Sequence, residues 1–158
     1  MQNKTEKIEY LLQQYGNSLF RLCLVMLKNE ADAKDVIQET FIKYLQKAPV
    51  FANIEHEKAW LFRVASNTCL DLLRYQKRHP QKTLDMTQYM PTEKENPEIL
   101  DALLELPEKY RLALTLYYVE GYRINEIAEI IRKSPSAVKM RLQKGRNLLK
   151  NAYGKEER

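Results

Sequence analysis

The sequence is poor in the residues that make tight turns, disulfides and membrane spans. Its 158 residues include only four glycines and six prolines, a scarcity that favours long helices over a sheet with many turns. The two cysteines, Cys23 and Cys69, form no CxxC pair and fall on apolar helical faces, so we interpret them as core thiols. No apolar run approaches the roughly 18 residues of a transmembrane helix, and the polar N-terminus is unlike a signal peptide. We therefore expect a cytoplasmic protein without direct membrane insertion.

Acidic residues are also missing from one long stretch near the C-terminus. The net charge is only +5, but no acid occurs between Glu129 and Glu156. The basic residues of this interval are Arg132, Lys133, Lys139, Arg141, Lys144, Arg146, Lys150 and Lys155. A solvated helix face normally includes Glu, whereas a stripe of one sign attracts a polyanion such as nucleic acid. Residues 29–41 have the opposite bias, with four acids against one lysine, so we expect a different partner there.

The spacing of apolar residues predicts helices and shows no strand alternation. A first helix is predicted through residues 8–26, and a second begins after a plausible N-cap, Asn29, and stops at Pro49. Residues 50–57 are interpreted as a loop. A third helix is predicted from about Lys58 to Arg78, because its apolar residues recur at helical spacing.

A second helical unit follows a stretch with few apolar residues. Residues 80–97 contain three prolines and are interpreted as a flexible linker. Beyond it, Pro107 suits the first position of a helix that ends near Gly121. The chain is thus predicted to be all-α, with two small helical domains at residues 1–79 and 98–158 joined by the linker.

The basic stripe coincides with a helix-turn-helix pattern. Ala128 is expected at the tight contact between two short helices, with Ile127 and Ile131 on the inner side. Ser134 can cap the second helix, and Pro135 falls in its first turn, where no backbone donor is lost. The apolar face that answers from the second helix consists of Val138, Leu142, Gly145 and Leu149.

Two positions of this pattern carry an expected cost. Arg132 stands in the turn, where the backbone often takes a positive φ, at about 1 kcal/mol for a residue other than glycine. Gly145 inside the helix costs roughly 0.8–1 kcal/mol against alanine, and we expect it to permit close helix approach. The face opposite the apolar residues can contact base edges and phosphates: Ser136, Lys139, Met140, Gln143, Lys144 and Asn147. Arg141 and Arg146 lie towards its flanks, where contact with the DNA backbone is expected.

Three stretches together resemble a bacterial RNA polymerase sigma factor of the sigma-70 family, in its small extracytoplasmic-function (ECF) class. They are ADAKDVIQETFIKYL at 31–45, KAWLFRVASNTCLDLLRYQKR at 58–78, and LPEKYRLALTLYYVEGYRINEIAEIIRKSPSAVKMRLQKGRNLL at 106–149. They occur in the family's order and cover nearly all of the chain outside the linker. The resemblance implies that residues 1–79 are sigma domain 2 and residues 98–158 are sigma domain 4.

The resemblance also implies partners for each part of the chain. The first stretch would bind core RNA polymerase at the clamp helices, through Asp32, Asp35, Val36, Gln38, Glu39 and Phe41. The loop and helix around the second stretch would read and melt the −10 element, through Asn53, His56, Lys58, Arg63, Asn67, Asp71, Arg74, Lys77 and Arg78. The helix-turn-helix would read the −35 element, through Ser136, Lys139, Met140, Arg141, Gln143, Lys144 and Arg146. Further implied partners are the polymerase flap and an anti-sigma factor.

The sequence departs from the family pattern at two places. Two other classes of function also compete with the sigma-factor interpretation. Relatives often carry an aromatic residue just before Trp60, where Glu57 and Lys58 stand here, and many have Ser where Arg123 sits. A dimeric helix-turn-helix regulator is the rival hypothesis, but it needs neither the acidic helix nor a flexible bridge. An enzyme is disfavoured because we find no Gly-rich phosphate loop, no HExxH and no nucleophile–base arrangement. We expect no cofactor and no metal.

Overall fold

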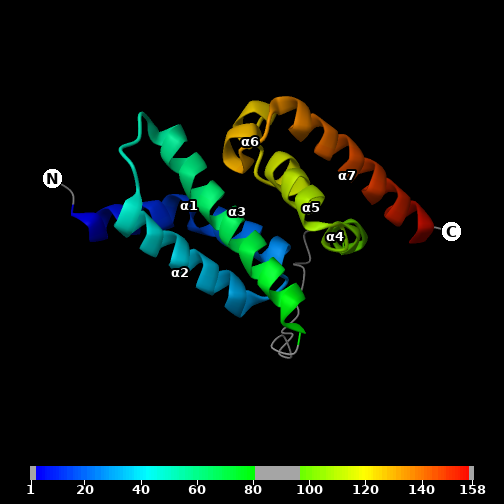
Figure 1. The fold of residues 1–158 in the computed structure, drawn as a ribbon, viewed down its shortest axis with the longest axis horizontal. Helices are drawn as coiled ribbons and strands as arrows, with labels where there is room; N and C mark the ends of the chain where they lie inside the picture. The colour runs from blue at the N-terminus through cyan, green and yellow to red at the C-terminus, as the bar shows by residue number, and fades with distance from the viewer. Residues whose placement is uncertain (1–2, 81–96, 157–158) are drawn as a thin grey trace. The chain divides into compact units, whose positions relative to one another are not determined.

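The computed structural model describes residues 3–80 and 97–156, and its contacts divide the chain into two compact units. Unit 1 is Met1–Thr87 and unit 2 is Gln88–Arg158 (Figure 1). The linker predicted at residues 80–97 lies outside the described residues, apart from Pro80 and Pro97. Within the described ranges every regular element is a helix, as predicted, and none of the helices is both long and apolar enough to cross a membrane.

Unit 1 packs α1 (Lys4–Leu27), α2 (Glu30–Lys47) and α3 (Ile54–Arg78) around a shared apolar core. Each helix begins at an asparagine whose side chain accepts a hydrogen bond from a backbone amide three residues later: 2.7 Å for Asn3, 2.9 Å for Asn29 and 2.9 Å for Asn53. Both cysteines are buried as free thiols in this core, as predicted.

The predicted start of α3 is wrong by four residues. The helix begins at Ile54, not at about Lys58, so the connection from α2 is shorter than the expected loop over 50–57. The reason is the Asn53 cap, whose side chain satisfies the amide of His56 and lets the helix start before its first apolar contact.

Unit 2 contains α4 (Pro97–Leu104), α5 (Glu108–Leu114), the π-helical turn η2 (Thr115–Val119), α6 (Ile124–Ile131) and α7 (Pro135–Glu156). The single helix predicted from Pro107 to Gly121 is therefore interrupted by the wider turn η2. Gly121 does end it as expected, at φ 75°, in the left-handed region that favours glycine.

A buried arginine ties the first two helices of unit 2 together. The side chain of Arg111 in α5 donates to the backbone oxygens of Leu104 and Leu106, at 2.9 and 3.0 Å. These carbonyls stand at the end of α4 and just beyond it, where an α-helix leaves its last acceptors unsatisfied. The hydroxyl of Thr115 donates to the carbonyl of Arg111 at 2.7 Å, at the junction where the π turn begins.

Candidate polymerase and promoter interfaces

Three acidic residues of α2, Asp32, Asp35 and Glu39, lie on one side of the helix. Asp35, Gln38 and Glu39 are exposed, and Glu39 makes an ion pair with Lys43 at 3.3 Å one turn further along. Such a pair on an exposed helix contributes only about 0.3–0.5 kcal/mol, so Glu39 stays available to a partner. Asp32 is half-buried and accepts a hydrogen bond from Gln76 of α3 at 3.1 Å.

The structure revises the roles of the two apolar residues predicted for polymerase binding. Val36 is 2% exposed and Phe41 is 6% exposed, so both belong to the core of unit 1. Buried side chains offer a partner almost no surface. They fix how α2 packs, and the part of the predicted set that reaches the surface consists of its four polar residues, Asp32, Asp35, Gln38 and Glu39.

Helix α3 carries a polar stripe along its length. Arg63, Asn67, Asp71, Arg74 and Arg78 follow one another at intervals of three or four residues, which places them on one helical face. Asn67, Asp71, Arg74 and Arg78 are exposed, whereas Arg63 is half-buried. Arg74 donates to Asp71 at 3.0 Å, so the one acid of the stripe is balanced within it. Lys77 is exposed in the last turn.

The three candidates predicted in or near the loop have different surroundings. Asn53 is the α3 cap, and its side-chain oxygen is engaged by the amide of His56. His56 is exposed in the first turn. Lys58 is half-buried, with its ammonium 5.7 Å from the ring centre of Tyr15. These contacts set Lys58 apart from the polar stripe.

An aromatic cluster that sequence reasoning missed joins the α2–α3 connection to both helices. Phe51 in the connection stacks against Tyr44 of α2 at 6.3 Å between ring centres. Trp60 of α3 meets Tyr44 and Phe51 edge-on, at 5.9 and 6.0 Å. Trp60 is half-buried.

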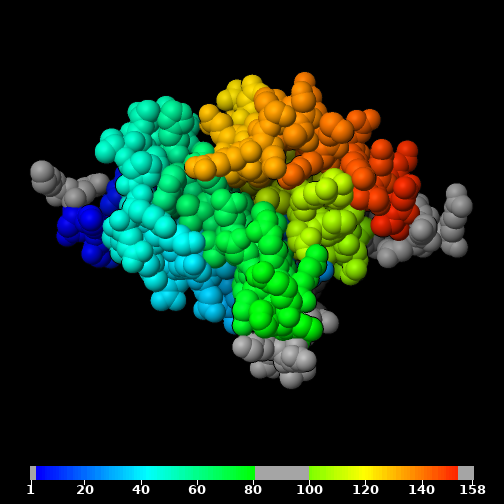
Figure 2. All heavy atoms as spheres, viewed as in Figure 1, coloured from blue at the N-terminus to red at the C-terminus, as the bar shows by residue number. Residues whose placement is uncertain are grey.

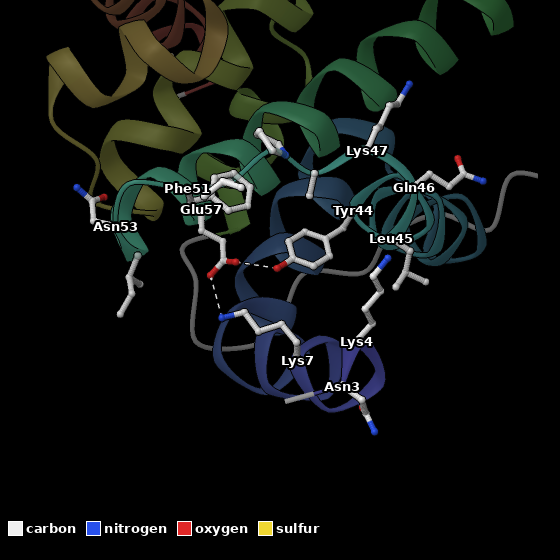
Figure 3. A pocket seen from close by; sticks show the side chains of 14 residues that line it. Asn3, Lys4, Lys7, Tyr44, Leu45, Gln46, Lys47, Phe51, Asn53 and Glu57 are labelled. Carbon is white, nitrogen blue, oxygen red and sulfur yellow. Dashed lines mark hydrogen bonds and ion pairs between the residues drawn. The ribbon is translucent and has the colours of Figure 1, made fainter. Parts of the chain in front are cut away.

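Beside this cluster lies a pocket of about 650 Å³. It is lined by the first turns of α1, the end of α2 and the connection to α3 (Figure 3). Glu57, 6% exposed, takes part in its lining and is paired twice: the Tyr44 hydroxyl donates to it at 2.8 Å, and Lys7 forms an ion pair at 3.4 Å. Other side chains at the pocket include Lys4, Lys47, Asn53, Val50 and Ile54.

The buried carboxylate changes the chemistry of its tyrosine partner. Burial, the hydrogen bond to Glu57 and the negative charge of that residue all raise the pKa of Tyr44 far above its usual value. The phenol therefore remains a neutral hydrogen-bond donor at any physiological pH. The pocket lining combines the polar groups of Glu57 and Lys7 with the aromatic rings of Tyr44 and Phe51, a combination that suits a nucleobase, which has a π-face and polar edges.

The turn between α6 and α7 has the local features predicted for a helix-turn-helix. The Ser134 hydroxyl accepts from the amide of Ala137 at 3.1 Å, which confirms the predicted cap of α7. Arg132 ends α6 in the left-handed conformation, at φ 56°. At the other end of α6, the amide of Arg123 donates to Glu126 at 2.8 Å, so Glu126 satisfies the N-cap amide from inside the helix, as the glutamate of a capping box does.

The core of the helix-turn-helix differs from the prediction at one residue of each helix. Ile127, Val138 and Leu142 are buried as expected, but Ile130 is buried in place of Ile131, which is only half-buried. Leu149 in the latter part of α7 is also half-buried. The choice between Ile130 and Ile131 depends on the rotation of a short helix, which a run of two isoleucines does not specify.

Gly145 confirms the expected close approach of helices in unit 2. A Cβ at this position would lie 3.1 Å from Leu114 Cδ1 and 3.4 Å from Tyr110 Cβ. Both neighbours belong to α5, so the missing side chain is what lets α5 and α7 pack this closely. The same packing brings Lys144, the residue just before Gly145, beside Tyr110.

The outer face of α7 is exposed along its described length, and in Figure 2 side chains of this helix (orange and red) lie at the surface. Of the seven predicted −35 contacts, only Arg141 is half-buried. The other six are exposed: Ser136, Lys139, Met140, Gln143, Lys144 and Arg146. Two of the basic side chains on this helix contact tyrosines. Lys144 Nζ lies 5.6 Å from the Tyr110 ring centre, and Arg146 donates to the Tyr118 hydroxyl at 3.1 Å.

The lysines around Tyr110 also shift its titration. Burial raises the pKa of the Tyr110 phenol, but hydrogen bonding by Lys144 and the charge of Lys109 outweigh it, and the net pKa is lowered. Both ammonium groups lie close to this ring, at 5.1 Å for Lys109 and 5.6 Å for Lys144 from its centre.

Two family models match the chain in the order of its two units. The model described as Sigma-70 region 2 matches residues 11–79, and the model described as Sigma-70, region 4 matches residues 97–149. The ECF RNA polymerase sigma factor SigM of Bacillus subtilis (strain 168) is 32% identical over 160 residues, covering 94% of this chain and 96% of that protein. The RNA polymerase sigma factor SigV of the same strain is 29% identical over 150 residues, covering 92% and 90%.

A solved structure shares the fold. It is the sigma factor RpoE in complex with the anti-sigma factor NepR from Bartonella quintana, with a TM-score of 0.76 and 21% identity over 93% of this chain and 96% of that one. Two family matches, one on each unit, together with a helix-turn-helix, define a transcription factor of the sigma type. The chain belongs to the ECF class of the sigma-70 family of RNA polymerase sigma factors.

Proposed function

We propose that this protein is a promoter-specificity subunit that has no catalytic activity of its own and acts in the cytoplasm. It binds core RNA polymerase, recognises the −10 and −35 elements and directs initiation. The observation that carries this proposal is that the two units expose helix faces of opposite charge. In unit 1 the face on α2 is acidic, and in unit 2 the face on α7 is basic and free of acids. One face suits a basic protein surface and the other suits DNA.

Each unit recognises one promoter element. With the domain limits predicted from the sequence, residues 1–79 recognise the −10 element, residues 98–158 recognise the −35 element, and residues 80–97 form the linker. In unit 2, the capped N-terminus of α7 presents the exposed predicted contacts to the major groove. Arg141 and Arg146 stand at the flanks, where phosphates of the groove edges are in reach.

In unit 1, the polar stripe of α3 and the pocket together bind one strand of the melted −10 element. Arg74, Lys77 and Arg78 supply exposed positive charge for its phosphates. A base that has been extruded from the duplex needs a pocket to offset the few kcal/mol lost in unstacking. The pocket beside Phe51 and Tyr44 has the required volume and aromatic wall, so we assign the extruded −10 base to it.

The polymerase and inhibitor contacts follow from the same surfaces. Asp35, Gln38 and Glu39 are the exposed residues proposed to meet the clamp helices, with Asp32 at the edge, and unit 2 is proposed to meet the flap. The RpoE structure contains an anti-sigma factor, and we propose that this chain is regulated by one as well, in a stress or envelope response.

Transcription in vitro tests the proposal. The purified full-length protein, added to core polymerase, is expected to direct start-site-specific initiation on fragments of the genome. A dimeric helix-turn-helix regulator predicts instead a dimer in solution that binds a palindromic site and needs another sigma factor for initiation. Failure to direct any start site, together with a dimer in sedimentation analysis, would favour the regulator.

A further inference from the structure

One apolar side chain interrupts the polar outer face of α7. Met140 is 70% exposed, and it is the one large hydrophobic residue exposed on the part of α7 whose side chains the structure describes, up to Ala152. Isolated exposed hydrophobic residues are common on protein surfaces, so exposure alone decides nothing. The position of Met140 within the recognition helix is what gives it meaning.

Met140 occupies the centre of the face that points away from the core. Ser136 lies one turn before it, and Gln143 and Lys144 lie one turn after it, so all four share one side of the helix. These three neighbours are exposed, whereas Val138 and Leu142, on either side of Met140 in sequence, are buried. A helix that lies in a groove with this face inward places Met140 against base edges rather than phosphates.

The chemistry of the methionine side chain restricts what it can recognise there. Its thioether is at best a weak hydrogen-bond acceptor, so it cannot satisfy the polar groups of a guanine or adenine edge. The major groove offers one apolar feature, the C5-methyl group of thymine. We propose that Met140 selects a thymine in the −35 element by contact with that methyl group, an inference that rests on the proposed function of α7.

The contact predicts a measurable and local effect. Removing one methyl group from an apolar contact weakens binding by about threefold to fivefold, the value expected for one buried methyl or methylene group. Replacing a thymine by deoxyuridine removes only that methyl group and leaves every hydrogen-bonding group of the base in place. The loss should occur at one base pair and should depend on Met140.

The test uses the full-length protein with core polymerase and a duplex whose −35 element has been defined by selection from a random library. Each thymine on either strand is replaced singly by deoxyuridine, and the affinity is measured for the wild type and for Met140→Ala and Met140→Leu. The inference requires one position at which deoxyuridine lowers the affinity of the wild type and of Met140→Leu about threefold to fivefold. At the same position the affinity of Met140→Ala should not change. Because Met140 is exposed, the alanine variant should fold normally, which circular dichroism verifies.

The outcomes separate this inference from the proposed function. If the library yields a specific −35 element but deoxyuridine has no effect at any position, or the same effect in Met140→Ala, Met140 does not read a methyl group. If no specific element is selected and no start site is directed, the proposed function itself fails.

Discussion

The two units of this protein begin several of their helices by different means. In unit 1, an asparagine side chain caps each helix and accepts from an amide at 2.7–2.9 Å. In unit 2, α5 follows Pro107 without a side-chain cap, and Glu126 contributes to the cap of α6 from inside the helix. Capping side chains thus begin all three helices of unit 1 and, through Ser134, α7 of unit 2. The helices α5 and α6 depend more on packing against their neighbours.

The space around a helical glycine also differs between the two units. A Cβ on Gly16 of α1 would meet only Leu12 of its own helix, at 3.8 Å. A Cβ on Gly145 of α7 would lie at 3.1 Å from a core leucine of another helix, Leu114. Gly16 is therefore a weak point that unit 1 tolerates, and Gly145 is a requirement of the packing in unit 2.

The largest expected effect is that of Gly145→Val. The added side chain overlaps Leu114 and Tyr110, and overpacking of this kind lowers the free energy of unfolding by about 1–3 kcal/mol. Denaturation of the full chain can be followed by two signals, because the single tryptophan, Trp60, lies in unit 1. The far-UV circular dichroism transition should shift to lower denaturant for part of its amplitude, while the Trp60 fluorescence transition stays in place.

The control for this variant is Gly16→Val in the other unit. Its Cβ has room, so the Trp60 transition should change by no more than about 0.5 kcal/mol. If both variants lose the same stability, the two glycines do not differ in the way the packing indicates.

The same contrast explains which parts of the fold could be predicted from the sequence. Caps and stops such as Asn29, Ser134 and Gly121 are local signals, and they were read correctly from single residues. The start of α3 was missed because Asn53 was assigned to the loop and its capping role was overlooked. The π turn η2 was not predicted: Thr115, at its start, donates to the carbonyl of Arg111, a buried contact that no periodic pattern encodes.

The candidate site was predictable where it depends on charge along one helix. The acidic face of α2 and the basic face of α7 are visible in the sequence because their residues are neighbours in it. The cluster of Tyr44, Phe51 and Trp60 was missed, since it joins an α2 residue, a connection and an α3 residue through packing. Val36 and Phe41 fall on the apolar face that the helical spacing predicts for α2, and they are buried; the resemblance also placed them in the polymerase-binding set because a family motif mixes core and surface positions.

A second prediction concerns the acidic face of unit 1. Glu39→Gln should weaken binding to core polymerase about tenfold, equivalent to ~1.4 kcal/mol, because it removes an exposed charge at the proposed contact. Binding to naked DNA should not change. A quantitative pull-down with core enzyme or its clamp fragment, beside a DNA-binding titration, measures both.

Glu30→Gln is a matched control for this change. Glu30 and Glu39 are both exposed on α2, and each pairs with a lysine four residues later at 3.3 Å. The two substitutions therefore remove the same charge and the same kind of ion pair. Equal losses in the pull-down would show that α2 acts through its overall charge and has no defined contact at Glu39.

The third prediction concerns the basic face of unit 2. Lys144→Ala should lower promoter affinity about threefold to fivefold and reduce the slope of the log affinity against log salt plot by about 1, the effect of one phosphate contact. Gln143→Ala, the exposed neutral neighbour, should alter sequence preference and leave the slope unchanged. An unchanged slope in Lys144→Ala would mean that Tyr110, and not a phosphate, is the main partner of this lysine.

The smallest expected effect compares the left-handed residues that end one helix in each unit. Lys28 after α1 has φ 58° and Arg132 after α6 has φ 56°. Glycine adopts this conformation without steric cost, although it also makes the unfolded chain more flexible, so Lys28→Gly and Arg132→Gly should each stabilise their unit by about 0.5–1 kcal/mol. Trp60 fluorescence should report the first gain and far-UV circular dichroism the second. If Arg132→Gly destabilises unit 2, the arginine side chain must contribute contacts that outweigh its backbone strain, and the turn of the helix-turn-helix would then require arginine for a reason beyond its conformation.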